Sequence, residues 1–316
     1  MSNGTENRTS HLTSVRCKGT ENRTSHLTSV RCKRRSAVAL LMLILAAMCA
    51  GDRAAHALDD PVQFLIIQPG SPGSSDEAAP LMTRLADYLA ARVPGRPIVK
   101  ALYVNTPDTA ERAVRTLNPR AAIVTLPYYL EQRVRHRLQA KLISRPGGRA
   151  EDHYHLLVSS AGAVADWRAL HGEVAGTLCF TADAASRLLF GRPVSMLPFR
   201  CQPTDRLLRA SRQVVSGELA GLIVTDEQYG SLMALPEGKS LKELLTTGPL
   251  PPPLVVTFEP QDGASSGLTK ALLEMKNDPT ARALLAELRT DGFTPVDPAV
   301  IEQVQSDYAR AAGPTK

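Results

Sequence analysis

The stretch VQFLIIQPGSPGSSDEAAPLMTRLADYLAARV, residues 62–93, decides the class of fold. It begins with a six-residue apolar run at 62–67, continues through a turn rich in Gly, Ser and Pro, and ends with apolar residues at helical spacing. Ser75 or Asp76 can cap the helix, and Pro94 follows its expected end. A short apolar strand, a turn and an amphipathic helix form the repeating unit of an α/β protein.

The same alternation continues to about residue 160 and then starts again. We expect further strands at 98–104, 121–125, 142–143, 153–159, 176–181, 194–199, 221–224 and 254–258. We expect further helices at 108–117, 126–138, 183–190, 204–216, 226–233, 268–276, 280–289 and 298–311. Strands that alternate with helices favour parallel sheets, and two successive runs of them indicate two α/β lobes.

The N-terminal segment GTENRTSHLTSVRCK occurs at residues 4–18 and recurs unchanged at 19–33. Each copy carries two aliphatic residues, so two copies cannot bury a core between them. We therefore interpret residues 1–33 as a duplicated prefix, untranslated or removed, with the true start inside the second copy.

A secretory signal follows this prefix. A basic cluster, KRR, precedes the 14-residue apolar run at 37–50, which is short for a membrane span of about 20 residues. The small-x-small pattern AHA then predicts a signal peptide over residues 34–57, cleaved after Ala57. A lipid anchor at Cys49 is the alternative, although Met48 stands where a small residue is expected. We predict export to the periplasm.

The positive charge of the chain belongs to its first 57 residues. They hold nine of the 37 Lys and Arg residues and three of the 31 Asp and Glu residues, which leaves 28 of each in the remainder. The mature part is therefore neutral, and the high isoelectric point gives no support for nucleic-acid binding.

Two of the five cysteines, Cys179 and Cys201, remain in the mature part. In an oxidising compartment such a pair predicts a disulfide, which here would close a loop of about 22 residues. Two buried free thiols are the alternative.

Two short motifs resemble catalytic or metal sites. The GASSG stretch at 263–267 matches a nucleophile elbow, but no histidine follows His171, so we interpret it as a capped turn. His153 and His155 lie on one face of a predicted strand, but zinc needs three or four ligands, so we expect an ordinary strand. We predict no enzyme activity, no cofactor and no metal.

Hydroxyl and carboxyl residues stand at several predicted strand-to-helix turns, where helix N-termini favour an anion or a polar solute. Each is alternatively a plain N-cap. Their recurrence in both lobes predicts a shared ligand cleft, for which we name Ser74, Tyr128, Thr181, Ser186, Thr204 and Asp226.

Four further segments carry a resemblance, in their order and spacing: AAIVTLPYYLEQ at 121–132, LHGEVAGTLCFTADAAS at 170–186, DRLLRASRQVVSGELAGLIVTDEQY at 205–229 and LLEMKNDPTARALLAELRTDGFTPVD at 272–297. Over nearly all of 60–311 the chain resembles the phosphate-, phosphite- and phosphonate-binding proteins of ABC transporters. The resemblance implies a two-lobed, type II periplasmic-binding-protein-like fold of the Venus flytrap kind. Its first lobe would comprise residues 58–155 and 252–316, and its second lobe residues 156–251.

The resemblance also implies a site and a function. The family's Ser-Thr-Ser run at a helix start appears here at 183–186 with Ser186 retained, its His-Asp pair appears as Thr204 and Asp205, and its later acidic residue is Asp226. Tyr128 would form a wall, and Thr181 and Ser186 would donate hydrogen bonds. The expected function is that of a monomer that captures a small polar or anionic solute and presents it to a membrane permease. A periplasmic ligand-sensing module without a transporter is the alternative.

Overall fold

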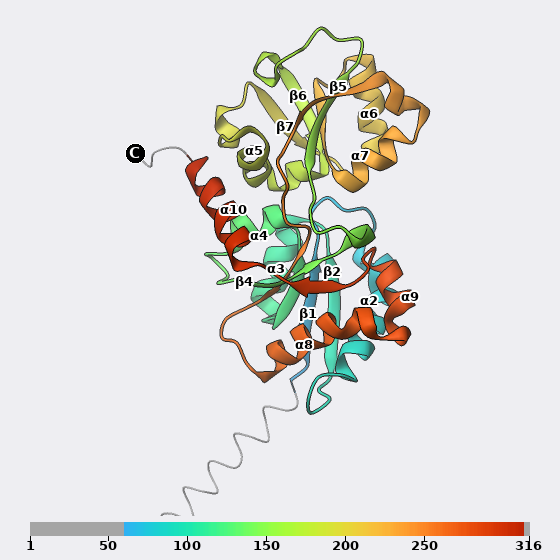
Figure 1. Ribbon diagram of the computed structural model, residues 1–316, viewed down its shortest axis with the longest axis vertical. Helices are drawn as coiled ribbons and strands as arrows, with labels where there is room; N and C mark the ends of the chain where they lie inside the picture. The colour runs from blue at the N-terminus through green and yellow to red at the C-terminus, as the bar shows by residue number, and fades with distance from the viewer. Residues whose placement is uncertain (1–59, 313–316) are drawn as a thin grey trace, which may run out of the picture. The chain divides into compact units, whose positions relative to one another are not determined.

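The computed structural model describes residues 60–312, and the predicted repeat, signal peptide and lipid-anchor cysteine lie outside them. These residues form two sheets flanked by helices (Figure 1). We refer to the first sheet with its helices as the first lobe and to the second as the second lobe. Across residues 60–312, every helix is too short or too polar to cross a membrane.

The first sheet has six strands in the order β11-β4-β10-β3-β1-β2. β1 pairs in parallel with β2 and β3, whereas β10 pairs antiparallel with β3 and β4. Its strands are β1 (Val62–Ile67), β2 (Val99–Val104), β3 (Ala121–Val124), β4 (Gln139–Ser144), β10 (Leu254–Thr257) and β11 (Phe293–Pro295). Its helices are α2 (Ser75–Ala90), α3 (Pro107–Leu117), α4 (Leu126–Gln132), α8 (Gly263–Glu274), α9 (Arg282–Glu287) and α10 (Pro298–Arg310).

The second sheet has five strands in the order β7-β6-β8-β5-β9. β6 pairs in parallel with β7 and β8, whereas β5 pairs antiparallel with β8 and β9. Its strands are β5 (Tyr154–Ser159), β6 (Gly172–Gly176), β7 (Phe199–Pro203), β8 (Gly221–Thr225) and β9 (Leu241–Thr246). Its helices are α5 (Ala182–Phe190), α6 (Leu207–Ser216) and α7 (Asp226–Met233).

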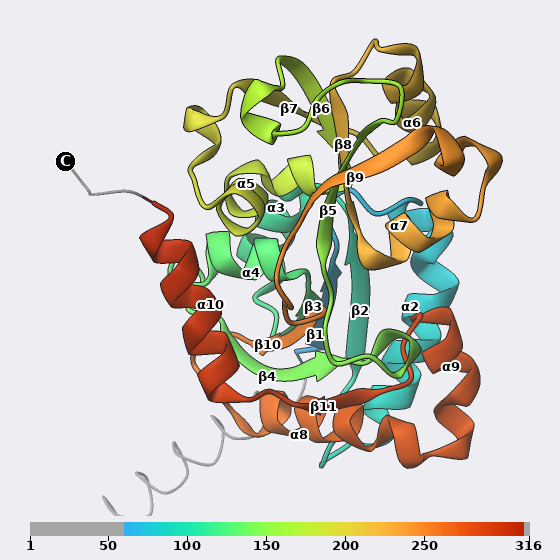
Figure 2. The same cartoon turned by 45° about the horizontal axis from the view of Figure 1, so that its top comes forward.

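The chain crosses between the lobes twice, from β4 to β5 and from β9 to β10 (Figure 2). β5 enters the second sheet between β8 and β9, and β10 enters the first sheet between β3 and β4. Each arrives from the opposite lobe and runs against its neighbours. The two crossing segments pair with each other at Asp152 and Leu250. This confirms the predicted α/β class. Both sheets are mixed, because the pairs that β1 and β6 form are parallel, whereas those that β4, β5 and β10 form are antiparallel.

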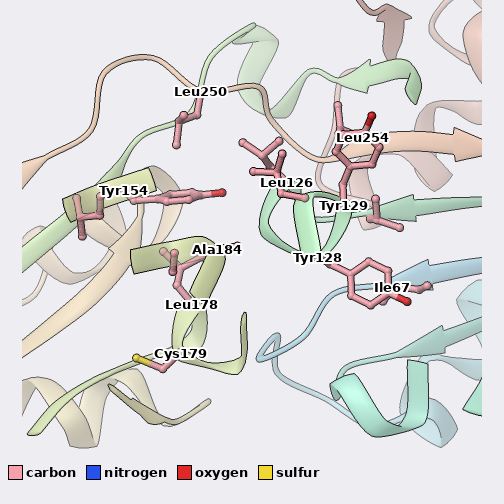
Figure 3. Packing of buried hydrophobic residues seen from close by; sticks show 14 of the residues in the cluster. Ile67, Leu126, Tyr128, Tyr129, Tyr154, Leu178, Cys179, Ala184, Leu250 and Leu254 are labelled. Atoms are coloured by element: carbon pink, nitrogen blue, oxygen red, sulfur yellow. The ribbon is translucent and has the colours of Figure 1, made fainter. Parts of the chain in front are cut away.

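One of three hydrophobic clusters in the described residues is shared between the lobes, and each of the other two belongs to one lobe. One hydrophobic cluster includes Ile67 and Leu126 of the first lobe, Leu178 and Ala184 of the second, and Leu250 of the crossing segment (Figure 3). Because each of these side chains is at most 8% exposed, apolar burial, at roughly 25 cal/mol per Å², holds the two lobes together here.

Two predicted strands of the second lobe are wrong in position. β6 ends at Gly176, where a Cβ atom would lie 2.2 Å from the carbonyl oxygen of Ile223, and the chain then turns into the 3-10 helix η4 (Thr177–Thr181). The predicted strand at 194–199 begins instead at Phe199, after another 3-10 turn. In the first lobe, α4 is shorter than predicted, because the helix expected over 126–138 ends at Gln132.

The predicted disulfide is not formed, because Cys179 and Cys201 are free thiols in the structure. They are neighbours nonetheless. Cys201 pairs in register with Val174, and the Cys179 thiol lies 3.6 Å from the carbonyl oxygen of Val174, to which it donates. A hydrogen bond to Cys201 and burial raise the pKa of the Cys179 thiol.

Candidate ligand-binding cleft

A cavity of about 420 Å³ lies between the carboxyl ends of strands from both lobes. The loop after β1, the N-terminus of α4, η4, the N-terminus of α7 and the crossing segment at 144–152 all contribute to its lining. This is where ligands bind in open α/β sheets, and the volume is within the range of small-molecule sites.

The first-lobe wall is a preorganised loop. Ser74 caps α2 in a reciprocal box: its hydroxyl accepts from the Glu77 N–H at 3.2 Å, and its own N–H donates to the Glu77 carboxylate at 2.8 Å. The Asn105 side chain donates to the carbonyl oxygens of Gly73 at 2.6 Å and Ser71 at 3.1 Å. The carboxylate of Glu77 therefore occupies the N-terminus of α2 from within the same helix.

The second-lobe wall is built around Gln228. Thr225 caps α7, and the Gln228 side chain accepts from the Thr225 N–H at 3.1 Å while it donates to the Thr177 hydroxyl at 3.0 Å. Thr181 lines the same cavity, and its hydroxyl donates to the carbonyl oxygen of Leu178 at 3.3 Å. Hydroxyl and amide groups of this wall are thus held in place by local hydrogen bonds.

Charged side chains in the lining carry more negative than positive charge. The carboxylates are those of Glu77, Asp152, Glu227 and Glu287, and the guanidinium groups are those of Arg149 and Arg289. Arg289 of the first lobe reaches Glu227 of the second at 2.9 Å, so this ion pair spans the cleft. Arg149 lies 3.4 Å from the carboxylate of Asp226.

Asp226 sits beside the cleft in a network of histidines. It accepts from His155 Nε2 at 2.8 Å and contacts His153 Nδ1 at 3.1 Å, while the other His155 nitrogen contacts Glu243 at 2.7 Å. The Tyr229 ring stacks on His155 with centroids 4.4 Å apart. Burial opposes ionisation of Asp226, but the hydrogen bonds from the two histidines outweigh it and lower its pKa. Within residues 60–312, no group of three or more His, Cys, Asp and Glu could hold a metal ion.

The structure brings two of the six predicted residues, Ser74 and Thr181, to the cavity wall. Tyr128 is 3% exposed in the shared core beside Ile67, and burial raises the pKa of its hydroxyl (Figure 3). Ser186 is also buried and donates to the carbonyl oxygen of Arg192 at 2.7 Å.

The other two predicted residues lie outside the cavity wall, Thr204 in a turn and Asp226 at the first position of α7. Thr204 accepts from the N–H of Arg206 at 3.1 Å, and Asp226 belongs to the histidine network. Sequence reasoning missed Asp152, Arg149, Gln228 and Arg289. Gln228 carries a readable signal, because it stands three residues after the capping Thr225.

Ser265 of the GASSG motif has a structural role. Its hydroxyl accepts from the Asp262 N–H at 3.0 Å, and the Asp262 carboxylate accepts from the Ser265 N–H at 2.8 Å. This is the capping box of α8, as the interpretation of a capped turn predicted.

Two α/β lobes joined by two crossing segments, with a polar cleft between them, define the class of type II periplasmic binding proteins. The chain belongs to the family described as "ABC transporter, phosphonate, periplasmic substrate-binding protein", whose profile matches residues 71–301. Members of this family are periplasmic substrate-binding proteins rather than enzymes. They bind a small molecule and deliver it to the permease of an ABC transporter. No curated protein sequence matches the chain.

Solved structures with the same fold include XAC2383 from Xanthomonas citri, bound to ATP, at a TM-score of 0.65 and 16% identity over 80% of this chain and 97% of that one. A binding protein of an ABC phosphonate transporter from Pseudomonas aeruginosa gives 0.59 and 13%, over 80% and 88%. PhnD1 from Prochlorococcus marinus, in complex with methylphosphonate, gives 0.56 and 11%, over 80% and 99%.

Proposed function

We propose that this protein captures a small polar or anionic solute between its lobes, with a phosphonate- or phosphate-like oxyanion as the candidate ligand, for an ABC transporter. The observation that carries the proposal is the cleft, in which hydroxyl groups and two guanidinium groups converge from both lobes. The hydroxyl residues are Ser71, Ser74, Tyr103, Thr125, Ser144, Thr177, Thr181, Thr225 and Thr290. The ligands of two similar structures, ATP and methylphosphonate, both carry tetrahedral phosphorus–oxygen groups.

Within this proposal, Ser74 and Thr181 contact the ligand directly. Asp226 acts through Arg149, whose guanidinium it positions at the cavity wall. Tyr128 and Ser186 contribute to packing beneath the wall, and Thr204 to the turn before α6.

A thermal-shift screen against inorganic phosphate, methylphosphonate, sulfate and small organic acids tests the ligand class. A ligand present at a hundred times its dissociation constant adds about 2.7 kcal/mol of stability. Arg149→Gln, in the cleft, should lose most of the shift. Arg200→Gln, whose side chain is 82% exposed, should retain it. The absence of a shift with every oxyanion would overturn the ligand class.

We further propose that the protein reaches the periplasm through a signal peptide at residues 34–57 and acts there as a monomer. Membership of a periplasmic family supports the location. Intact mass of the exported protein should correspond to a chain that begins at Leu58, and its elution on a sizing column to one copy. A mass that includes residues 1–33 would contradict the processing.

A further inference from the structure

Asp152 is located where the two crossing segments meet. Its backbone N–H donates to the carbonyl oxygen of Leu250 at 2.8 Å, and its carbonyl oxygen accepts from the Leu250 N–H at 2.9 Å. The backbone of Asp152 is therefore fixed at the connection between the lobes, and its side chain lines the ligand cleft.

The two carboxyl oxygens of Asp152 have different surroundings. Oδ1 accepts from the N–H of His153 at 3.0 Å and from the N–H of Asp226, the first residue of α7, at 3.3 Å. For Oδ2 no hydrogen-bond partner is found in the described part of the chain. One oxygen thus anchors the second lobe to the crossing segment, and the other is available to the cleft.

The burial of Asp152, together with its hydrogen bonds and neighbouring charges, makes its protonation state responsive near neutral pH. Burial raises the pKa of Asp152 to about 6, the Asp226 N–H lowers it, the Asp226 carboxylate raises it, and the His153 N–H and Arg149 lower it. The ionisable residues that act on it or are acted on by it are Arg149, His153, Tyr154 and Asp226, and Glu227 lines the same cavity. Arg149 is paired with Asp226, and Glu227 with Arg289, so neither guanidinium is dedicated to Asp152.

We propose that Asp152 is a specificity-determining residue of the cleft, which binds an anionic solute in its protonated form and donates a hydrogen bond from Oδ2 to a ligand oxygen. The proposal rests on the proposed oxyanion ligand. An ionised Asp152 would repel an oxyanion, whereas a carboxylic acid forms a short, charge-assisted O–H···O⁻ bond. The proton comes from solvent, so binding of the anion takes up a proton.

Protonation of Asp152 also explains how an oxyanion could bind in a cleft that holds more carboxylates than guanidinium groups. Neutralisation of Asp152 removes one of the four negative charges of the lining without a further basic residue. Its consequence is quantitative, because the apparent dissociation constant rises as the binding-competent fraction falls. With a pKa of about 6, affinity should fall roughly twentyfold between pH 5.5 and pH 7.5.

Calorimetric titration with methylphosphonate between pH 5.5 and pH 7.5 tests the inference on wild type, Asp152→Asn and Glu151→Gln. Asparagine keeps an acceptor for both N–H groups and offers a permanent donor, so Asp152→Asn should bind like wild type at pH 5.5 and about twentyfold more tightly at pH 7.5. Methylphosphonate ionises in the same way in all three titrations, so its own pH dependence cancels when each variant is compared with wild type at the same pH. Glu151→Gln removes an exposed neighbouring carboxylate outside the cavity and should follow wild type.

Parallel pH profiles for wild type and Asp152→Asn would overturn the role of Asp152 and leave the oxyanion ligand standing. Failure of wild type to bind methylphosphonate, phosphate or sulfate at pH 5.5 would overturn both the ligand class and this inference. If Asp152→Asn does not fold, wild type is titrated at pH 6.5 in two buffers of different ionisation enthalpy. Proton uptake beyond that of the probe supports the inference, and its absence overturns it.

Discussion

The two sides on which the lobes meet are built from different chemistry. On one side, α4 packs on α5 and α5 packs on α10, around the shared cluster that includes Leu126, Leu178 and Ala184 (Figures 2 and 3). We refer to this as the packed side. On the other, which we call the polar rim, the Arg289–Glu227 ion pair spans the cleft and Gly70 closely approaches Thr177.

The difference indicates which side yields first when the lobes separate. Apolar burial adds up over area and depends little on the exact geometry, whereas an exposed ion pair is worth about 0–1 kcal/mol. The packed side should therefore act as the pivot, and the polar rim should open and close over the ligand. The two crossing segments, which pair at Asp152 and Leu250, join the lobes between these two sides.

The largest effect is expected from Leu126→Ala on the packed side. Leu126 is 2% exposed, and truncation of such a side chain leaves a cavity that costs about 2–5 kcal/mol. Leu235, which is 38% exposed, provides the control, and Leu235→Ala should change the free energy of unfolding by less than about 0.5 kcal/mol. Denaturant unfolding measures both. Equal effects would show that the packed side is not a stabilising interface.

Oxidation of Cys179 and Cys201 should stabilise the second-lobe part of the packed side. A bridge across a loop of about 22 residues is worth roughly 3 kcal/mol in the chain-entropy model. The free energy of unfolding of wild type, whose thiols are free in the structure, should rise by about 3 kcal/mol after treatment with an oxidant, whereas that of Cys201→Ser should not change. Full alkylation of both thiols after treatment with an oxidant would show that the two neighbouring thiols cannot be oxidised to a bridge.

The third effect concerns the closest contact at the polar rim. Gly70 has φ +82°, and a Cβ atom there would lie 2.6 Å from the carbonyl oxygen of Thr177 in the other lobe. Gly73 has φ +94°, but its nearest neighbour would be a flexible carboxylate oxygen at 3.4 Å. Both Gly→Ala variants should lose about 1–3 kcal/mol through backbone strain. Gly70→Ala alone should also separate the lobes, seen as an increased radius of gyration in X-ray scattering. Equal radii of gyration for Gly70→Ala and Gly73→Ala would show that the contact between Gly70 and Thr177 does not limit how closely the lobes approach.

Structure that depends on neighbouring residues could be predicted from the sequence, whereas structure that depends on distant segments could not. Local signals decide β1, the helix after it and α7, where Thr225 caps a helix that spans Asp226–Met233 as predicted. The apolar residues after Gly176 fit a strand as well as they fit the 3-10 helix η4 that they form. The close approach of Gly176 to Ile223, a contact between distant segments, ends the strand there. Residue periodicity carries no information about contacts between distant segments, so the sequence pattern could not predict this end of the strand.

Site residues divide in the same way. Ser74 and Thr181 stand next to helix starts, so their position at the cavity wall follows from local pattern. Asp152, Arg149 and Arg289 reach the cleft because the chain crosses between lobes and returns, which residue spacing does not reveal. Tyr128 follows a strand end too, but α4 turns it into the shared core.

The pH dependence of stability tests the polar contact within the packed side. The Glu131 carboxylate of α4 accepts from the Ala184 N–H of α5 at 3.0 Å. Burial raises the pKa of Glu131, opposed by that hydrogen bond. A raised pKa means that the folded protein binds the proton more tightly than the unfolded chain. The stability of wild type relative to Glu131→Gln should therefore fall as pH rises above the ordinary value for glutamate. Glu302→Gln, at an exposed position, is the control. If the difference in free energy of unfolding between wild type and Glu131→Gln does not change with pH, the raised pKa of Glu131 is contradicted.

The smallest effect on stability, and the sharpest test of the comparison, is expected from Arg289→Ala at the polar rim. Its pair with Glu227 is exposed, with side chains 73% and 55% accessible, so unfolding should change by less than about 1 kcal/mol. Arg200→Ala breaks a similar exposed pair with Glu173, but within the second lobe. Because the Arg289–Glu227 pair joins two lobes, its loss should increase the radius of gyration of the ligand-free protein, and high salt should reproduce the increase in wild type. Arg200→Ala should leave the radius unchanged. If both variants leave it unchanged, the polar rim does not hold the lobes together and closure depends on the ligand.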